Sequence, residues 1–476
     1  MLKDYHFIIL GGGSGGLVCA AEAARLQAKA ALVEKFKMGG DCLNTGCVPS
    51  KAILRSAKLA HDLSNAKRFG LPQTVPTVSL HEILASVRRV QKEIEPHDSV
   101  ERFESLGVAI YEGSFRFLSP YEISDGTTRL KAKRFVIATG SKPFVPAIPG
   151  LDKIPYLTSD HVWDLKELPA RLVVLGGGPI GVELAQAFAR LGSRVTIVEM
   201  LERLLAGEDP EASKLLQEAL TEEGVAVLTG HRAMQVDKGK KGFELTCAEG
   251  SVLKKISFDQ ILVAVGRSPN VEGLALEKAN VAYSSKRGIA VDSYLRTSAK
   301  HIYACGDVCG PYPFAHMADF QARLILRNAF FPGKVNADYR VVPWSTFTDP
   351  EIARVGFTEA EAKENNIPHD IYTCAMKDLD RAVCDREAKG FIKVLTARGK
   401  DQILGATLVG TRAGEMIPPF IQAMHLKTGL KKLSSLISIY PTLAEGTKRI
   451  VDTYNRSRVT PKFKIWLKRY MRWRFG

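Results

Sequence analysis

Residues 39–51 (GGDCLNTGCVPSK) carry two cysteines, Cys42 and Cys47, with four residues between them. This spacing lets two sulfurs meet, so the pair could alternate between a dithiol and a strained, reducible disulfide. Pro49 favours a helix that begins here and runs on through Leu54, which places Cys47 near a helix N-terminus. That position stabilises the thiolate, the reactive form of cysteine. The alternative is a pair of buried, inert cysteines.

A glycine-rich turn of the dinucleotide-binding type precedes the cysteine pair. It lies between a short apolar strand at 7–10 and a helical stretch at 17–26. The next strand, 30–33, ends in Glu34, an acid suited to a ribose hydroxyl. Glycines here let the backbone approach a pyrophosphate at a helix N-terminus. The alternative is a Gly-rich turn in an unrelated α/β protein. The G-x-G-x-x-G glycines are Gly11, Gly13 and Gly16.

A second unit of the same kind begins 165 residues after the first one. A strand at 171–175 leads into a helix at 182–191, and the strand at 194–198 again ends in an acid, Glu199. Two complete units in one chain imply two different dinucleotides. Its glycines are Gly176, Gly178 and Gly181.

Together, these motifs resemble those of the pyridine nucleotide–disulfide oxidoreductases, which include dihydrolipoamide dehydrogenase, glutathione reductase and mercuric reductase. The resemblance covers residues 5 to about 455, in order. It implies an α/β fold with two Rossmann-like dinucleotide-binding domains, for FAD and NAD(P), and a C-terminal α+β dimerisation domain. It also implies a homodimeric flavoprotein enzyme that passes electrons from NAD(P)H to FAD, to Cys42–Cys47, and to a thiol, disulfide or metal-ion substrate.

The resemblance also divides the chain. Pro143, Pro146 and Pro149 mark a linker after the first FAD portion. The expected parts are 1–150 and 271–340 for FAD, 151–270 for NAD(P), 341–455 for dimerisation, and 456–476 as a basic amphipathic tail.

Catalytic roles follow from the resemblance residue by residue. Cys42 would be the interchange thiol and Cys47 the charge-transfer thiol facing the flavin. Lys51 would lie near flavin N5, and Glu183 matches the acid that pairs with this lysine in relatives. The alternative for Glu183 is an acid favoured by the dipole at a helix N-terminus.

The cofactor contacts implied by the resemblance gather at the glycine turns and in a few short segments. Asp41 stands where many relatives have Thr, which would alter a contact to the FAD phosphates. Glu199 would repel a 2′-phosphate, and only Arg203 is nearby, so NADH is favoured over NADPH. No structural metal site is expected. The expected contacts are Gly11, Gly13, Ser14, Gly15, Gly16, Glu34, Lys35, Gly40, Asp41, Lys51, Gly113, Thr139, Gly140, Asp307, Ala315, Gly176, Gly178, Ile180, Gly181, Glu199, Gly266 and Arg267.

The loop at 438–446 departs from the better-known relatives. In dihydrolipoamide dehydrogenase and glutathione reductase a His, held by a later Glu, precedes the Pro-Thr pair and serves as acid–base for substrate thiols. Here that residue is Tyr440, and Glu445 is retained. A phenol has a pKa of about 10, and general-base catalysis contributes about 10²–10⁴-fold, so we expect slow turnover of ordinary dithiols.

A tyrosine at this position resembles mercuric reductase, where a tyrosine of the partner subunit helps to bind the metal ion. Two features of that branch are missing: an N-terminal heavy-metal-binding module, and a C-terminal cysteine pair, because no cysteine follows Cys384. The leading hypothesis is a mercuric-reductase-like enzyme, the second is dihydrolipoamide dehydrogenase, and one of another class is a membrane-recruited redox adaptor. Tyr440 could also simply fill space.

Composition sets outer limits on these hypotheses. The chain has 476 residues and eight cysteines, too few for a disulfide scaffold. No apolar run reaches the roughly 18–20 residues of a membrane span, and Met1–Tyr5 leaves no room for a signal peptide, so we expect a cytoplasmic protein. Cys305 and Cys309 are not expected to form another redox pair, because Cys305 occupies a small-residue position in residues 302–307, which resemble a FAD-binding segment of the family.

The tail holds about half of the net charge of +15, with eight basic residues and no acid in 456–476. The rest is only mildly basic, which argues against a nucleic-acid surface. At 100° per residue, Phe463, Trp466, Leu467, Tyr470 and Trp473 share one face of a helix at 461–475, and most charges lie opposite. This is typical of a helix on a membrane surface or on an acidic partner. This would place the protein at the inner membrane face. The alternative is a helix packed on its own dimer, or a solvated tail.

Overall fold

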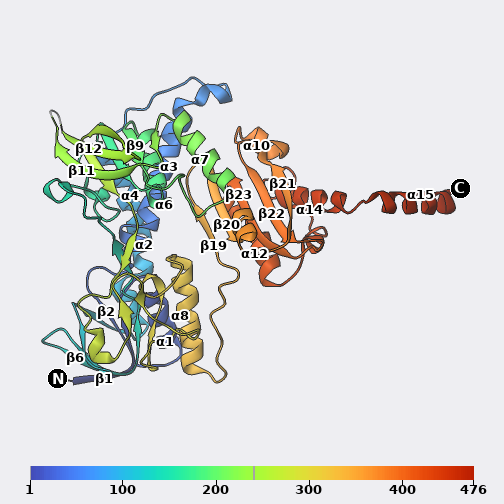
Figure 1. Ribbon diagram of the computed structural model, residues 1–476. Helices are drawn as coiled ribbons and strands as arrows, with labels where there is room; N and C mark the ends of the chain where they lie inside the picture. Colours follow the sequence, from blue (N-terminus) through green and yellow to red (C-terminus); the bar gives the residue numbers. More distant parts are fainter. Residues whose placement is uncertain (1, 240–241) are drawn as a thin grey trace. The chain divides into compact units, whose positions relative to one another are not determined.

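The computed structural model describes residues 2–239 and 242–476, which form two compact units (Figure 1). Unit 1 comprises residues 2–65, 73–200, 231–239 and 242–338, and unit 2 comprises 66–72, 201–230 and 339–476. Both nucleotide-binding motifs and the cysteine pair lie in unit 1, whereas Tyr440 and the tail lie in unit 2.

The first sheet of unit 1 has the strand order β3-β2-β1-β6-β5-β4, with β18 on β6. Strand β1 is apolar over 7–10 because both of its faces are buried: Phe7 and Ile9 pack in one core cluster, Ile8 and Leu10 in another. Helices α1 (Ser14–Arg25) and α8 (Ala315–Phe330) contribute to the first cluster. The strands are β1 (Leu2–Leu10), β2 (Ala30–Glu34), β3 (Ala109–Glu112), β4 (Arg116–Ser119), β5 (Glu122–Ser124), β6 (Arg129–Ile137) and β18 (Ile302–Ala304).

A second parallel sheet in unit 1 carries the second glycine turn, with strand order β9-β8-β14. Helix α6 (Pro179–Arg190) follows the turn. The strands expected at 171–175 and 194–198 are confirmed. The other elements are an antiparallel sheet and two short strand pairs. The strands are β8 (Arg171–Leu175), β9 (Arg194–Val198), β14 (Gln260–Val263), β11 (Arg232–Lys238), β12 (Phe243–Glu249), β13 (Val252–Phe258), β7 (Ser141–Pro143), β15 (Arg267–Pro269), β16 (Tyr283–Ser284) and β17 (Gly288–Ile289).

Both helices that follow the glycine turns begin three residues before the expected positions, at Ser14 and Pro179. The third glycine of each motif, Gly16 or Gly181, therefore lies inside the first turn of its helix. A sequence pattern of apolar residues cannot show this, because the first turn of each helix contains a glycine that packs closely against backbone.

The cysteine segment is helical on both sides of Gly46. Helix α2 (Gly40–Asn44) contains Cys42, and helix α3 (Cys47–Ser64) begins at Cys47, so the expected placement of this thiol at a helix N-terminus is confirmed. Helix α4 (Leu80–Ile94) packs against α3, and α5 (Val100–Ser105) follows it.

Unit 2 is built on an antiparallel sheet with strand order β19-β20-β23-β22-β21. Its core includes Ile392, Val394, Phe420, Ile450 and Val451. Thr358 and Glu361 form a capping box at the start of α9. The elements are β10 (Ala226–Leu228), β19 (Pro343–Thr346), β20 (Glu351–Gly356), β21 (His369–Ala375), β22 (Phe391–Ala397), β23 (Ile403–Gly410), α7 (Pro210–Glu222), α9 (Glu359–Glu364), α10 (Asp380–Cys384), α11 (Ala413–Met416), α12 (Pro418–His425), α13 (Leu430–Leu433), α14 (Glu445–Ser457) and α15 (Pro461–Phe475).

In the part of the chain that the structure describes, none of the helices has both the length and the apolar character needed to cross a membrane.

Candidate active site at Cys42 and Cys47

The first glycine turn forms a cradle that only glycine allows. Gly11 has a φ of +110°, and a Cβ there would lie 2.3 Å from the carbonyl oxygen of Ala138. A Cβ on Gly16 would lie 1.8 Å from the oxygen of Gly11. The N–H of Gly12 donates to Glu34 Oε2 at 2.5 Å, so the acid lies at the turn where a ribose would bind. These residues fit a dinucleotide such as FAD, with its pyrophosphate at the N-terminus of α1.

The second glycine turn repeats this geometry. Gly176 has a φ of +105°, and a Cβ there would lie 2.4 Å from the oxygen of Ala264. A Cβ on Gly181 would lie 2.0 Å from the oxygen of Gly176. The N–H of Gly177 donates to Glu199 Oε2 at 2.6 Å. A second dinucleotide therefore fits at the N-terminus of α6.

Two side chains from distant elements hold the segment between the cysteines. Gln91 on α4 donates from Nε2 to the carbonyl oxygens of Leu43 and Asn44, at 2.9 and 2.8 Å. Trp163 donates from Nε1 to the carbonyl oxygen of Thr45 at 2.9 Å. Neither role could be predicted from the sequence, because no motif surrounds Gln91 or Trp163.

A hydrogen bond between the two thiols shifts their pKa values in opposite directions. The hydrogen bond with Cys47, together with burial, raises the pKa of Cys42 well above its ordinary value. The hydrogen bond from Cys42, with the positive charge of Lys51, outweighs desolvation and lowers the pKa of Cys47 to about 7. Cys47 is therefore the thiolate near neutral pH, and Cys42 keeps its proton.

Lys51 and Glu183 join the cysteine segment to the second nucleotide unit. Lys51 Nζ donates to Glu183 Oε2 at 2.8 Å, and only 6% of the Glu183 side chain is exposed. Lys51 lies on α3, one turn after Cys47, and Glu183 lies on α6, two residues after Gly181. One ion pair thus connects the reactive thiolate with the helix that begins at the second glycine turn.

Asp41 and Arg267, which were expected as separate cofactor contacts, form an ion pair. Arg267 also donates from Nε to Ser141 Oγ at 2.7 Å, and Ser141 Oγ donates to Asp307 Oδ2 at 2.6 Å. Burial raises the pKa of Asp41, and the Arg267 charge opposes this. The carboxylate that replaces the usual threonine is thus balanced by a guanidinium of the same unit.

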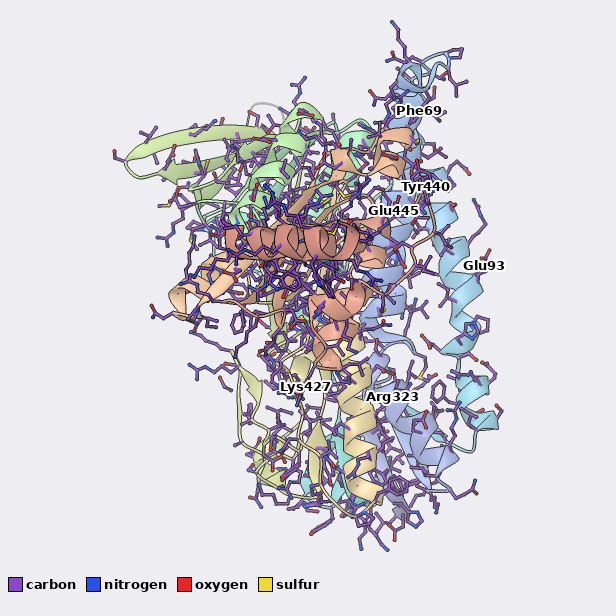
Figure 2. The ribbon with its side chains drawn as sticks, turned by 90° about the vertical axis from the view of Figure 1, so that its right-hand side faces the viewer. Phe69, Glu93, Arg323, Lys427, Tyr440 and Glu445 are labelled. Atoms are coloured by element: carbon purple, nitrogen blue, oxygen red, sulfur yellow. The ribbon has the colours of Figure 1, made fainter. Side chains whose placement is uncertain are left out.

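Tyr440 and Glu445 lie close together in unit 2 (Figure 2). The Tyr440 side chain is exposed, and its hydroxyl donates to Asp380 Oδ2 at 2.8 Å. This hydrogen bond and the Asp380 charge raise the pKa of Tyr440, with Glu445 and Cys384 adding to the effect. The phenol is therefore held protonated at neutral pH. Asp380, the first residue of α10, was missed by the sequence interpretation.

Residues 5–322 match the family model described as pyridine nucleotide-disulphide oxidoreductase, and residues 342–451 match the dimerisation domain of the same family. The chain belongs to this family. Membership makes it a flavoprotein oxidoreductase and implies FAD and NAD(P)H as its cofactors. The dimerisation domain supports a homodimer.

Curated relatives of this oxidoreductase are named for two different activities, mercuric reductase and dihydrolipoyl dehydrogenase. A mercuric reductase of Bacillus cereus is 35% identical over 453 residues, which cover 95% of this chain and 72% of the relative. A dihydrolipoyl dehydrogenase of Thermus scotoductus is 36% identical over 469 residues, covering 96% of this chain and 99% of the relative.

Two solved structures have the same fold. The HOCl-induced flavoprotein disulfide reductase RclA of Escherichia coli superimposes with a TM-score of 0.85 at 26% identity, covering 94% of this chain and 99% of RclA. LpdA of Mycobacterium tuberculosis gives a TM-score of 0.86 at 27% identity, covering 96% and 99%.

One further side chain of this family member, Asn270, clamps the expected FAD segment at 138–140. Asn270 Nδ2 donates to the carbonyl oxygen of Thr139 at 2.9 Å, and Thr139 Oγ1 donates to the carbonyl of Asn270 at 2.8 Å. The N–H of Asn270 donates to the carbonyl oxygen of Gly140 at 2.9 Å. Sequence reasoning missed this residue, although it stands three positions after Arg267.

The other expected contacts of the oxidoreductase lie around the first turn, at the start of a helix or, for Gly266, between β14 and β15. Ser14 hydrogen-bonds to Cys42, and a Cβ on Gly15 would lie 2.9 Å from the buried Cys305 Sγ. The N–H of Gly113 donates to the carbonyl of Glu34 at 2.8 Å. The remaining positions are Lys35 over the Phe36 ring, Gly40 at the start of α2, Ile180 in the first turn of α6, Gly266 at a φ of +134°, and Ala315 at the start of α8.

Proposed function

We propose that the chain is an NADH-dependent reductase of soft metal ions and small thiol-bound species, similar to mercuric reductase, with Cys42 and Cys47 as its redox pair. The observation that carries this proposal is Tyr440 bonded to Asp380, in the loop where thiol-oxidising relatives have a His. The mercuric reductases among its relatives support it, and so does a solved structure of RclA that is a Cu(II) complex.

Disulfide substrates and soft metal ions differ in how the Cys42 thiol would lose its proton. FAD held at the first glycine turn would supply the two-electron chemistry that links NADH to the thiols. The Cys42–Cys47 disulfide would take up an electron pair and a proton and become a thiol and a thiolate. To attack a disulfide substrate, Cys42 must then lose its proton to a base, and its raised pKa makes this difficult.

A soft metal ion removes that difficulty. Thiol ligands lose their protons when a metal binds, so the ion itself displaces the proton of Cys42. Two electrons from the two sulfurs reduce the divalent ion to the metal and re-form the disulfide. Tyr440, kept protonated, can donate a hydrogen bond or bind the ion after losing its proton. By resemblance to the family, the Tyr440 loop serves the cysteines of the other protomer.

The nicotinamide preference belongs to the same proposal. Glu199 ends β9 and accepts a hydrogen bond from the second glycine turn, so its negative charge lies where a 2′-phosphate would enter. NADH avoids this repulsion.

A second candidate function is dihydrolipoamide oxidation. It is favoured by the dihydrolipoyl dehydrogenase that this chain matches over 99% of that relative's length. A redox adaptor with slow turnover is the third, and it rests only on the basic tail. We further propose the division into 1–150 with 271–340, 151–270, 341–455 and 456–476, and a cytoplasmic location.

Steady-state assays of the FAD holoenzyme separate these candidates. We expect NADH oxidation with thiol-complexed Hg(II) to exceed NADH oxidation with lipoamide or glutathione disulfide, and Cys42→Ser to remove all three. Faster turnover with lipoamide than with Hg(II) would favour the second candidate, and absence of turnover with every acceptor would favour the adaptor.

A further inference from the structure

The C-terminal segment of unit 2 carries a strong, unbalanced positive charge. Asp452 is the last acidic residue of the sequence. The basic side chains that follow it are Arg456, Arg458, Lys462, Lys464, Lys468, Arg469, Arg472 and Arg474.

Local interactions specify helix α15. Thr460 caps it, because its Oγ1 accepts the N–H of Phe463 at 3.2 Å, and Pro461 occupies the first helical position. Helix formation is thus encoded in the segment itself, while none of its residues is buried. Figure 1 shows α15 standing away from the sheet of its own unit. The match to the dimerisation domain ends at residue 451, before this helix.

One face of α15 is a continuous aromatic ladder. The ring centroids of Phe463 and Trp466 lie 5.6 Å apart, those of Trp466 and Tyr470 also 5.6 Å, and those of Tyr470 and Trp473 5.9 Å. Leu467 extends the same face. Trp466 and Trp473 are 56% and 79% exposed. Such a strip in contact with water is typical of an interaction surface.

The rest of the surface of α15 is mainly basic, with the exposed Ile465 and Phe475 among its cations. At 100° per residue, most of these cations point away from the ladder, and Lys462 borders it. Arg474 falls within the apolar arc, near the helix end, where a long stem lets the guanidinium reach polar surroundings. The other basic side chains of α15 are Lys462, Lys464, Lys468, Arg469 and Arg472.

We propose that α15 docks in the plane of an anionic lipid bilayer surface. The two faces suit a single planar boundary: tryptophan, tyrosine and phenylalanine rings enter the region below the head groups, while the lysines and arginines pair with anionic head groups. An acidic protein or a nucleic acid would match the cations but would leave the aromatic ladder without an apolar phase. The helix is about 22 Å long and bears a charge on nearly every turn, so it lies on the bilayer.

This surface is separate from the redox chemistry. None of the residues assigned to the cysteine site or to the two glycine turns lies in α15. Changes in α15 should therefore leave NADH-dependent turnover of the holoenzyme in solution unchanged, whichever substrate the enzyme reduces.

Vesicle co-sedimentation of the full-length FAD holoprotein tests the proposal. We expect at least about tenfold stronger partitioning onto phosphatidylcholine vesicles with about 30% phosphatidylglycerol than onto pure phosphatidylcholine, with a blue shift of tryptophan emission. Two variants should each weaken binding by about tenfold or more: Trp466→Ser/Tyr470→Ser/Trp473→Ser, which keeps the charge, and Lys464→Glu/Lys468→Glu/Arg472→Glu, which keeps the ladder.

The control reverses three exposed cations of unit 1, Lys278→Glu/Lys286→Glu/Arg287→Glu, with the same change in net charge. It should bind vesicles like the wild type. Three results would overturn the proposal: no preference for anionic vesicles, binding that survives the aromatic substitutions while heparin binds equally well, or an aromatic variant that sediments as a monomer. The last result would assign the helix to the dimer.

Discussion

The two glycine turns of unit 1 share their backbone geometry but differ in what covers them. In the first, a Cβ on Gly12 would lie 3.0 Å from Met38 Sδ, and a Cβ on Gly40 would lie 2.7 Å from the Cα of Gly13. The cysteine segment thus packs directly on the turn. In the second, a Cβ built on Gly178 would meet no atom within 4 Å among the residues that the structure describes, apart from those of Gly178 and its chain neighbours. A covered turn suits a cofactor that stays bound, and an open turn suits one that exchanges in each cycle.

Substitution of the third glycine in each motif should produce the largest contrast. Gly16→Ala and Gly181→Ala each press a Cβ to within 2.0 Å of a carbonyl oxygen, which should cost about 3 kcal/mol of stability or more at either site. We expect Gly16→Ala to be purified without FAD. Gly181→Ala should keep its flavin absorbance and lose reduction by NADH.

Gly178→Ala is the matched control, since its Cβ meets only open space among the described residues. It should fold normally, and any rise in the KM for NADH would measure how closely the nucleotide approaches the turn. If Gly16→Ala and Gly181→Ala both lost FAD, the first turn could not be distinguished from the second as the site of the permanently bound cofactor.

Cys42→Ser tests whether the covered turn holds a thiolate against the flavin. Cys47 then has no disulfide partner, so a long-wavelength charge-transfer band should be present without reductant, and disulfide turnover should disappear. Absorbance spectra at pH 8 check this. A spectrum of plain FAD would mean that the roles of the two sulfurs are reversed.

The ion pair between the two nucleotide units should tune that thiolate. The hydrogen bond from Cys42 and the charge of Lys51 lower the pKa of Cys47 to about 7, so the band of the reduced wild type should be half-developed near pH 7 and fade at lower pH. Lys51→Met removes a positive charge and should move the midpoint up by about one pH unit, whereas Glu183→Gln should move it down. Absorbance titration of Cys42→Ser with and without each change gives the shift of the midpoint against Cys42→Ser alone. Unmoved midpoints would show that Lys51 has no part in stabilising the thiolate.

The smallest expected effect concerns the acid at the open turn. Wild type should favour NADH over NADPH in kcat/KM, and Glu199→Gln should narrow the ratio because the repulsion of a 2′-phosphate is lost. Glu34→Gln is the counterpart at the covered turn and should change FAD retention while leaving the nucleotide ratio unchanged. A wild type that prefers NADPH tenfold, about 1.4 kcal/mol, would refute the assignment of Glu199.

Local patterns in the sequence predicted the strands, helices and turns that form the two glycine turns and the cysteine segment. Glycine spacing located the turns, and Pro49 located the helix that begins at Cys47. Partners distant in the sequence could not be found this way. Trp163 stands 118 residues from Thr45, and Tyr440 stands 60 residues from Asp380. Such contacts depend on how whole elements pack, which no short motif encodes.

Asp41 and Arg267 show that a contact between distant residues can be missed even when both residues are predicted site residues. Both were identified as cofactor contacts, but their ion pair joins positions 226 residues apart. The pair of Lys51 and Glu183 was anticipated only through resemblance to the family, because charge and spacing alone also fit a simple acid at a helix N-terminus.

Activity of Tyr440 variants tests the central claim, that the site serves an acceptor which needs no general base. Wild type should reduce thiol-complexed Hg(II) with NADH and oxidise dihydrolipoamide slowly. Tyr440→His, with Glu445 still present, should raise dihydrolipoamide oxidation by at least about tenfold, and Tyr440→Phe should lower Hg(II) reduction more than reduction of a small disulfide dye. Dihydrolipoamide oxidation by wild type on the order of 10² s⁻¹, with every activity unchanged in Tyr440→Phe, would contradict the claim.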